Sequence, residues 1–382
     1  MRHQNSVFHE LQKHIPWALF DRLVDKHKAD HRVRRLSTKS QFLALLFGQI
    51  AGADSLREIE AGLACHKARL YHLGGRCPAR TTLADANANR PAAVFCDLFA
   101  ALVANAGRGL RRAVGDAVYL IDSTGLRLSG MGSEWARFSA GVCGAKMHVI
   151  YDAHAERPVY AAVSAARVND ITAAHAMPIE PGATYVFDLG YFDYAWWADL
   201  DAARCRIVTR LKKNTPLAVT AELPVPDHGT ILSDRIGLLP KRRSKGKANP
   251  FTDPVREIRL KAENGAILRI VSNDLDAPAN AIAALYKRRW AIELFFRWIK
   301  QTLKIRHFLG RSENAVRIQI AVALVAYLLI KLAQNTQKAI ASPLAFARLV
   351  RLNLMHRRPI DALKDQPPTP PTDPRQLAFE LS

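Results

Sequence analysis

The first hundred residues consist of apolar stretches with helical spacing, separated by short polar or glycine-containing breaks. Apolar residues that recur every three to four positions lie on one face of a helix, so this pattern predicts an all-α region over 1–110. Two helix starts are marked, by Ser37 and by the capping box Ser55-Leu-Arg-Glu58. The expected helices cover 8–15, 19–26, 39–50, 56–64, 66–73, 80–89 and 92–105.

The stretches 66–73 and 80–89 flank the pair Gly74-Gly75, and two helices across such a turn have the outline of a helix-turn-helix. The signal is weak because helical hairpins usually only pack against each other. Earlier in this region, the segment 26–35 carries a basic cluster in which Arg34 and Arg35 are candidate contacts to duplex phosphates. A solvated loop is the other reading of that cluster.

From residue 117 the pattern changes to short apolar runs that predict strands. Within a region 111–213 the expected order is three strands, a helix, a strand, a helix and a strand. That order favours an α/β fold with a mixed sheet flanked by helices. The strands are expected at 117–122, with a short run at 126–128, and at 141–151, 159–164, 183–188 and 206–211; the helices are expected at 171–176 and 194–203.

Residues 214–275 break this alternation and are interpreted as a β-rich insertion. They include a predicted hairpin, 255–260 with 267–271, which turns at Asn264-Gly265. They also include the basic loop 240–247, which is expected to face DNA or to be mobile. Its candidate DNA contacts are Arg242 and Arg243.

The last part of the chain is predicted to be helical before it becomes irregular. A long helix is expected to start at Asp276-Ala-Pro278, because proline fits the first turn of a helix, where the missing backbone amide would have no partner within the helix. A second helix is expected over 314–336. Together they define a region 276–345. The tail 346–382 includes a proline-rich run, 366–374, and is expected to be extended and partly mobile.

The balance of charge narrows the possible partners. Lys and Arg number 55 against 34 Asp and Glu, a formal net charge of +21, which favours double-stranded DNA over a membrane surface. The most apolar run, 318–332, has about fifteen residues and is interrupted by Gln319, so a buried helix is expected there rather than a membrane span. No signal-peptide pattern follows Met1, and the five cysteines form no C-x2-C pair, which predicts a cytoplasmic protein with free thiols.

Three carboxylates are candidates for chemistry: Asp122 and Asp188 at the ends of apolar runs, and Glu293 in a helical stretch. A charged side chain beside buried strands is costly unless it is paired or bound to a metal. Each aspartate alone is weak evidence, because an aspartate at a strand end is more often a turn or helix cap. Asp116 and Asp170 are set aside on that ground, since the first precedes its strand and the second follows an expected cap at Asn169.

The helix around Glu293 gives the strongest signal. At about 3.6 residues per turn, Tyr286, Arg289, Glu293 and Lys300 lie within about 60° of one another on one face. A carboxylate that binds a metal, flanked by groups that bind phosphate, suits phosphoryl transfer. An ordinary amphipathic helix with an Arg/Glu ion pair remains the alternative.

The spacing Y-x2-R-x3-E-x6-K of these four residues resembles the signature of DDE transposases of the insertion sequence four family, and the following segment 304–314 is also similar to that family. The resemblance implies a ribonuclease-H-like catalytic core with a β insertion, preceded by an N-terminal helical DNA-binding domain. It further implies that Asp122, Asp188 and Glu293 are catalytic and hold two Mg²⁺ ions, for which Mn²⁺ can substitute. In the family the tyrosine, arginine and lysine of the signature hold transposon-end phosphates, roles that would fall to Tyr286, Arg289 and Lys300.

The resemblance therefore predicts a bacterial, nucleoid-associated DNA transposase that binds terminal inverted repeats, cleaves and joins DNA, and acts as a homodimer on that DNA. Two alternatives stay open: a nuclease of the same fold without strand transfer, and a non-catalytic DNA-binding regulator. On the expected strand 141–151, Lys146 and His148 share one face and are further candidate DNA contacts, with an ordinary sheet surface as the other reading.

Overall fold

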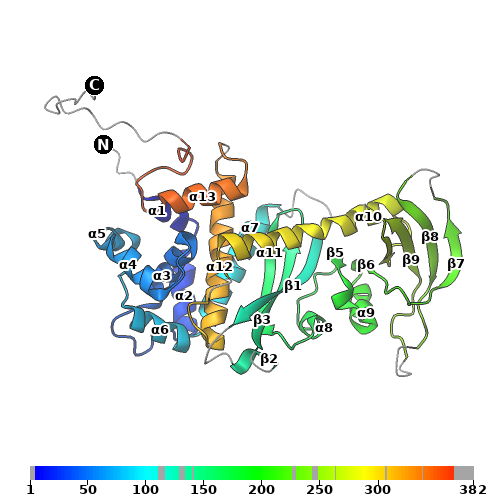
Figure 1. Ribbon diagram of the computed structural model, residues 1–382, viewed down its shortest axis with the longest axis horizontal. Helices are drawn as coiled ribbons and strands as arrows, with labels where there is room; N and C mark the ends of the chain where they lie inside the picture. The colour runs from blue at the N-terminus through cyan, green and yellow to red at the C-terminus, as the bar shows by residue number, and fades with distance from the viewer. Residues whose placement is uncertain are drawn as a thin grey trace. The chain divides into compact units, whose positions relative to one another are not determined.

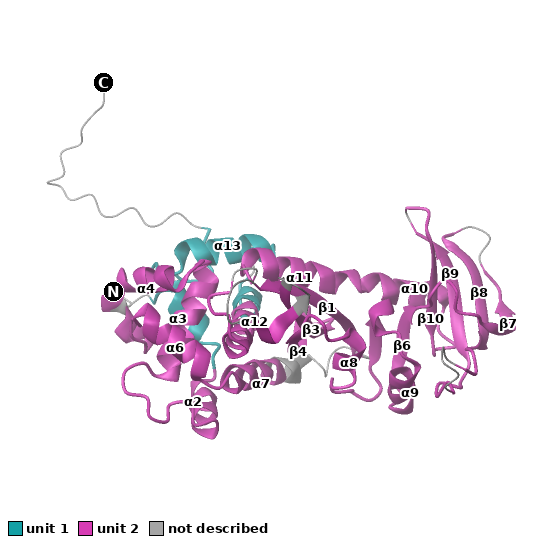
Figure 2. Cartoon of the chain, turned by 60° about the horizontal axis from the view of Figure 1, so that its bottom comes forward, with its two compact units in different colours: residues 1–15, 329–382 teal, residues 16–328 magenta. Residues whose placement is uncertain are grey.

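The computed structural model describes residues 5–110, 117–128, 134–139, 142–225, 229–242, 248–262, 264–305, 308–337 and 339–364. The chain divides into two compact units, one formed by 16–328 and the other by 1–15 together with 329–382 (Figure 2). The proline-rich run 366–374 and Asp116 lie outside the described residues. All three candidate carboxylates belong to the unit 16–328.

The smaller unit joins the two ends of the chain. Helix α1 (Val7–Gln12) is capped by Ser6, whose hydroxyl accepts a hydrogen bond from the His9 amide. The Val7 amide donates to the His356 carbonyl over 3.0 Å, which ties α1 to the segment that follows α13 (Pro343–Asn353). Residues expected to belong only to a tail thus include a capped helix.

Helix α12 (Glu313–Asn335) agrees with the expected buried helix. Among the described residues it is long and apolar enough to cross a membrane, but 78% of its most apolar window is buried. That burial is typical of a core helix in a soluble protein.

The helical region of the larger unit is arranged around α3, in which twelve residues are buried. The predicted starts are confirmed, because Ser37 accepts from the Ser40 amide and Ser55 from the Glu58 amide. The helix-turn-helix outline is wrong, because the segment expected at 66–73 forms only a four-residue helix and a short 3-10 turn. The helices are α2 (Trp17–Lys26), α3 (Thr38–Ala51), α4 (Leu56–Ala64), α5 (Lys67–Leu70), α6 (Arg80–Asn89) and α7 (Ala93–Leu110).

A single mixed sheet of ten strands follows, which confirms the expected α/β class. Its centre is parallel, with β1 next to β5 and β5 next to β6, whereas β3 joins β1 in the antiparallel sense (Figure 1). The strands are β1 (Val118–Leu128), β2 (Arg137–Ser139), β3 (Val142–Asp152), β4 (Arg157–Ala165), β5 (Thr184–Phe187), β6 (Arg206–Arg210), β7 (Ala218–Leu223), β8 (Ile231–Leu238), β9 (Val255–Lys261) and β10 (Ile267–Ser272).

One expectation about the strands needs correction. The runs 117–122 and 126–128 form one continuous strand, so Asp122 lies in the middle of β1 and not at its end. The segment 214–275 is rich in strands, as expected, and β10 pairs with β6, so that the central sheet continues through β9 and β8 to β7. The β-rich segment is therefore an extension of the sheet that carries the candidate carboxylates.

Helices flank both faces of this sheet (Figure 1). On one face lie α8 (Asp170–Ala174) and α9 (Tyr194–Ala202), where Trp196 and Trp197 are buried against Phe187. On the other face α10 (Ala279–Arg288) contacts β5 and β6, and α11 (Trp290–Thr302) contacts β1. The single long helix expected from 276 is thus two helices, interrupted at Arg289.

A buried ion pair fixes the start of α10 against the sheet. Arg256 of β9 donates to both carboxylate oxygens of Asp234 of β8, over 2.8 and 2.6 Å, and the two side chains are 7% and 2% exposed. The same guanidinium donates to the carbonyls of Leu275 and Ala277, just before α10 begins. The strands of the extension therefore determine where the helix with the signature residues starts.

We expect Arg256→Ala to lower the free energy of unfolding by about 3 to 5 kcal/mol, because it leaves the Asp234 carboxylate buried without a partner. Arg317→Ala is the control: Arg317 pairs with Glu313 on an exposed helix face, where such a pair contributes about 0.3 to 0.5 kcal/mol. Urea unfolding of both variants measures the difference. Equal losses would show that the buried pair does not hold this part of the fold together.

Candidate active site

Asp122 and Asp188 are brought together by parallel strand pairing. In β1 and β5 the last paired positions are Ile121 and Phe187, and the two aspartates are the next residues in that register. Side chains alternate across a strand, so both carboxylates leave the sheet on the same face, the one covered by α10 and α11. The two aspartates are 66 positions apart in the sequence, and the pairing of β1 with β5 makes them neighbours in space.

Glu293 reaches the same place from the first turn of α11, and Arg289 connects it to Asp122. The Arg289 Nη2 lies 2.6 Å from Glu293 Oε1, and its Nη1 lies 3.5 Å from Asp122 Oδ2. The Arg289 side chain is only 17% exposed, so its positive charge lies between the two acids and largely away from water. The structure thus joins Asp122 and Glu293 through one guanidinium, and Asp188 and Glu293 both lie near enough to Asp122 to affect its pKa.

The site penalises the charge on Asp122. The pKa of Asp122 is raised to about 6, chiefly by burial and also by the neighbouring Asp188 and Glu293, against the opposing effects of the Ser123 amide and Arg289. The Ser123 amide donates to Asp122 Oδ1 over 2.7 Å. Asp122 is therefore in a setting where an added cation would be favourable.

The donor atoms suit a hard divalent cation, because Mg²⁺ prefers carboxylate oxygens. In this conformation, no three acidic, histidine or cysteine side chains among the described residues are placed to hold one ion together. Arg289 supplies the positive charge between Asp122 and Glu293 instead. The carboxylates are therefore of the type that binds a divalent metal ion, and the Arg289 guanidinium balances the charge of Asp122 and Glu293 as a cation would.

Tyr286 and a residue that the sequence analysis missed, Arg210, complete the basic side of the site. The Arg289 guanidinium lies 5.9 Å from the centre of the Tyr286 ring. Burial raises the pKa of Tyr286, Arg210 and Arg289 lower it, and Asp188 raises it, so all of these charges are near the phenol. Arg210 ends the apolar strand β6, beside the strand that leads to Asp188, and that position was its sequence signal. Lys300 is half-buried two turns beyond Glu293 on α11.

Asp170, which the sequence analysis set aside, also lies at this end of the sheet. Its Oδ1 accepts hydrogen bonds from the Ser123 hydroxyl over 2.8 Å and the Lys146 ammonium over 3.1 Å. A Cβ at Gly190 would lie 3.3 Å from Asp170 Oδ2 and 3.0 Å from Asp188 Oδ1. A side chain at this position would therefore crowd both carboxylates, and glycine leaves room for them.

Lys146 and His148 are not the DNA contacts that their shared strand face suggested. His148 is completely buried and hydrogen-bonded to Ser164 over 2.8 Å, and burial lowers its pKa. The Lys146 ammonium is occupied by Asp170 and by the Val168 carbonyl. Both side chains stabilise the α8 side of the sheet, opposite Asp122, and the alternation of β3 alone could not show what covers that side.

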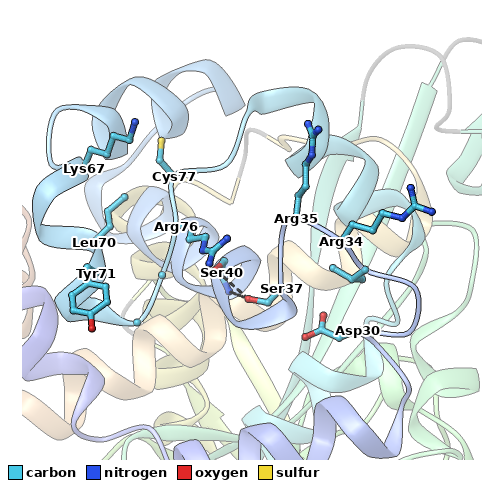
Figure 3. A pocket seen from close by; sticks show the side chains of 13 residues that line it. Asp30, Arg34, Arg35, Ser37, Ser40, Lys67, Leu70, Tyr71, Arg76 and Cys77 are labelled. Carbon is cyan, nitrogen blue, oxygen red and sulfur yellow. Dashed lines mark hydrogen bonds between the residues drawn. The ribbon is translucent and has the colours of Figure 1, made fainter.

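The remaining basic candidates lie away from the carboxylates along the chain. Arg34 and Arg35 are exposed side chains that line a cleft in the helical region (Figure 3). Arg242 is exposed next to a bridge to Ala248. Arg243 lies outside the described residues.

We expect Asp122→Asn to increase the stability of the metal-free protein at pH 7 by about 1 to 3 kcal/mol. The folded state binds the Asp122 proton more tightly than the unfolded chain, so this group contributes stability below about pH 4 that is lost as the pH rises through about 6. Urea unfolding with a chelator at pH 4 and pH 7 measures this, with the exposed Asp199→Asn as control. A gain at pH 4 and none at pH 7 would contradict the assigned pKa.

Comparison with known proteins agrees with this geometry. Residues 114–329 match the family model described as a transposase DDE domain, and residues 3–76 match a domain of unknown function. A protein of Sinorhizobium fredii named as the transposase y4zB is 40% identical over 312 residues, covering 79% of this chain and 86% of that protein.

A protein of Geobacillus stearothermophilus named as a transposase for insertion sequence element IS5377 is 27% identical over 274 residues, covering 69% of this chain and 70% of that protein. A solved piggyBac transposase complex with hairpin DNA aligns with 94% of this chain and 82% of its own, at 11% identity and a TM-score of 0.46. The DDE domain match covers more than half of the chain and contains all three carboxylates. The chain therefore belongs to the transposase DDE domain family and is a DNA transposase of the insertion-sequence type.

Proposed function

We propose that Asp122, Asp188 and Glu293 are the catalytic acids of this transposase and hold two Mg²⁺ ions, which Mn²⁺ can replace. Bound in this way, such ions activate a water or a 3′-hydroxyl and stabilise the leaving oxygen of a phosphodiester. The observation that carries the proposal is that Arg289 joins Asp122 to Glu293 while Asp188, the next residue of the paired strand, lies beside Asp122.

Arg289 has two roles in this proposal. Without metal it balances the charges of Asp122 and Glu293, to which it is already bonded. With a cation at the acids, the guanidinium would be available to the phosphate next to the scissile bond, where a planar fork of donors fits best. The break between α10 and α11 falls at Arg289 itself, a place where a small backbone adjustment is least disruptive.

The neighbouring groups position the DNA strand. Arg210 and Lys300 bind phosphates by charge, and Tyr286 does so through its hydroxyl. The surplus of positive charge, with Arg34, Arg35, Arg242 and Arg243 as contacts, holds the duplex of the terminal inverted repeats and the target. We further propose that two copies act together on the two ends, at the nucleoid of a bacterial cell. Lys146 and His148 are not part of this DNA contact.

The test of the catalytic assignment is Asp122→Asn. We expect it to bind end DNA with unchanged, salt-dependent affinity and to lose cleavage with Mg²⁺, because basic residues make the phosphate contacts whereas the acids serve the metal. Gel-shift and cleavage assays on the same duplex measure both. Cleavage at the wild-type rate would refute the metal assignment. A strand-transfer assay with a 3′-hydroxyl donor then separates a transposase from a nuclease that only hydrolyses.

A second test separates phosphate binding from a structural ion pair. Arg289→Ala and Lys300→Ala should reduce single-turnover end cleavage about ten- to a hundred-fold, equivalent to about 1.5 to 3 kcal/mol for one lost charge-assisted contact. Arg297→Ala, an exposed arginine on the same helix, is the matched control and should cleave normally.

Melting temperatures of the same variants identify a purely structural effect. Arg289→Ala should also lower stability, since it removes the partner of Glu293. Normal cleavage by a variant with a lowered melting temperature would refute the phosphate role of that residue.

A further inference from the structure

The loop between α2 and α3 separates two clefts in the helical region. One cleft, of about 790 Å³, has Arg34 and Arg35 on one wall and Lys67, Tyr71 and Arg76 on the other (Figure 3). The second, of about 690 Å³, again includes Arg34 and Arg35, here facing residues of α6 such as Asn89, with Lys28 and His31 also lining it. The segment Val33-Arg34-Arg35, the basic ridge, lines both clefts.

The charges on this surface are available to a ligand. Arg34, Arg35, Lys67 and Arg76 are exposed, and none of them has an ion-pair partner among the described residues. Each cleft also includes one acid, Asp30 in the first and Asp85 in the second, and Asp30 Oδ1 accepts from the amide and the hydroxyl of Thr38, each over 2.7 Å. The basic side chains outnumber the acid in each cleft, so both clefts carry a net positive charge.

The ridge is held in place by the protein and is not a loose loop. The buried Arg90 donates hydrogen bonds to the Leu36 carbonyl and to Gln41. Lys28 and Arg32 adopt φ angles of 51° and 60°, a left-handed conformation that costs a non-glycine residue of order 1 kcal/mol and persists only where contacts enforce it. A fixed pair of adjacent arginines binds with little loss of conformational entropy.

This shape fits the minor groove of duplex DNA better than the major groove. The minor groove is about 6 Å wide and lies between two phosphate backbones, and narrow A·T-rich grooves attract arginine side chains. Helix α3, whose N-terminus opens onto the first cleft, cannot enter a major groove, because nearly all of its residues are buried.

We propose that the basic ridge enters the minor groove of A·T-rich end DNA, with one phosphate backbone in each flanking cleft. Lys67 and Arg76 then contact one strand, and Lys28 and His31 the other. The inference rests on the proposed binding of end DNA, and it assigns a role to the segment 3–76, which matches a domain of unknown function.

The experiment measures binding of the full chain to a labelled end duplex, using Asp122→Asn to prevent cleavage. Adding Arg34→Ala and Arg35→Ala together should weaken binding about a hundred-fold or more, since each groove or phosphate contact contributes about ten-fold. Arg57→Ala, exposed on α4 and lining neither cleft, should bind normally. The melting temperature should not change, because both ridge side chains are exposed and unpaired.

Base substitution identifies the groove. Inosine·cytosine pairs present the minor-groove face of A·T and the major-groove face of G·C, because inosine lacks the amino group that guanine places in the minor groove. Replacing the A·T pairs under the ridge by inosine·cytosine should preserve affinity, whereas G·C should reduce it. Equal losses with both replacements would assign the contact to the major groove and overturn the proposal.

The outcomes also separate this inference from the proposed function. If the protein bound no end duplex at all, the proposed DNA function would fail. If it bound normally with both ridge arginines replaced by alanine, only the ridge would be excluded. Binding that is retained by Arg34→Lys with Arg35→Lys, but insensitive to G·C, would reduce the ridge to a phosphate contact and overturn the minor-groove assignment.

Discussion

The mutual repulsion of three carboxylates is the constraint on which the active site of this transposase depends. Asp122, Asp188 and Glu293 come from two strands and a helix that would separate if charge alone decided their positions. Arg289 opposes that repulsion with bonds to Asp122 and Glu293, but the pKa of Asp122 stays raised because burial outweighs the guanidinium. The fold must therefore supply the remaining free energy.

That free energy comes from the continuity of the sheet. Parallel pairing of β1 with β5 sets the two aspartates side by side, and the pairing of β6 with β10 extends the same sheet into the β-rich segment. From there Arg256 binds the carbonyls that precede α10 and so fixes the helices that carry Arg289 and Glu293. The strands of the β-rich segment thus support the helices that carry Arg289 and Glu293.

The two faces of the sheet hold different groups of acidic side chains. The face under α11 holds the three acids and Arg289. The opposite face holds Asp170, which is hydrogen-bonded to the Ser123 hydroxyl and paired with the Lys146 ammonium. Ser123 links the two faces, because its amide donates a hydrogen bond to Asp122 and its hydroxyl donates one to Asp170. The positive charge that we propose to hold DNA lies elsewhere, on exposed arginines such as Arg34 and Arg35.

The sequence by itself determined the α/β class and most of the element order, and it singled out the three candidate acids, because hydrophobic periodicity and the spacing from Tyr286 to Lys300 are local properties. Only the tertiary structure decided which strands pair, and therefore that the β-rich segment continues the main sheet. It also decided that Lys146 and His148 serve the α8 side, and that Asp170 belongs beside the site. Burial and pairing of a side chain depend on residues distant in the chain, which no local pattern contains.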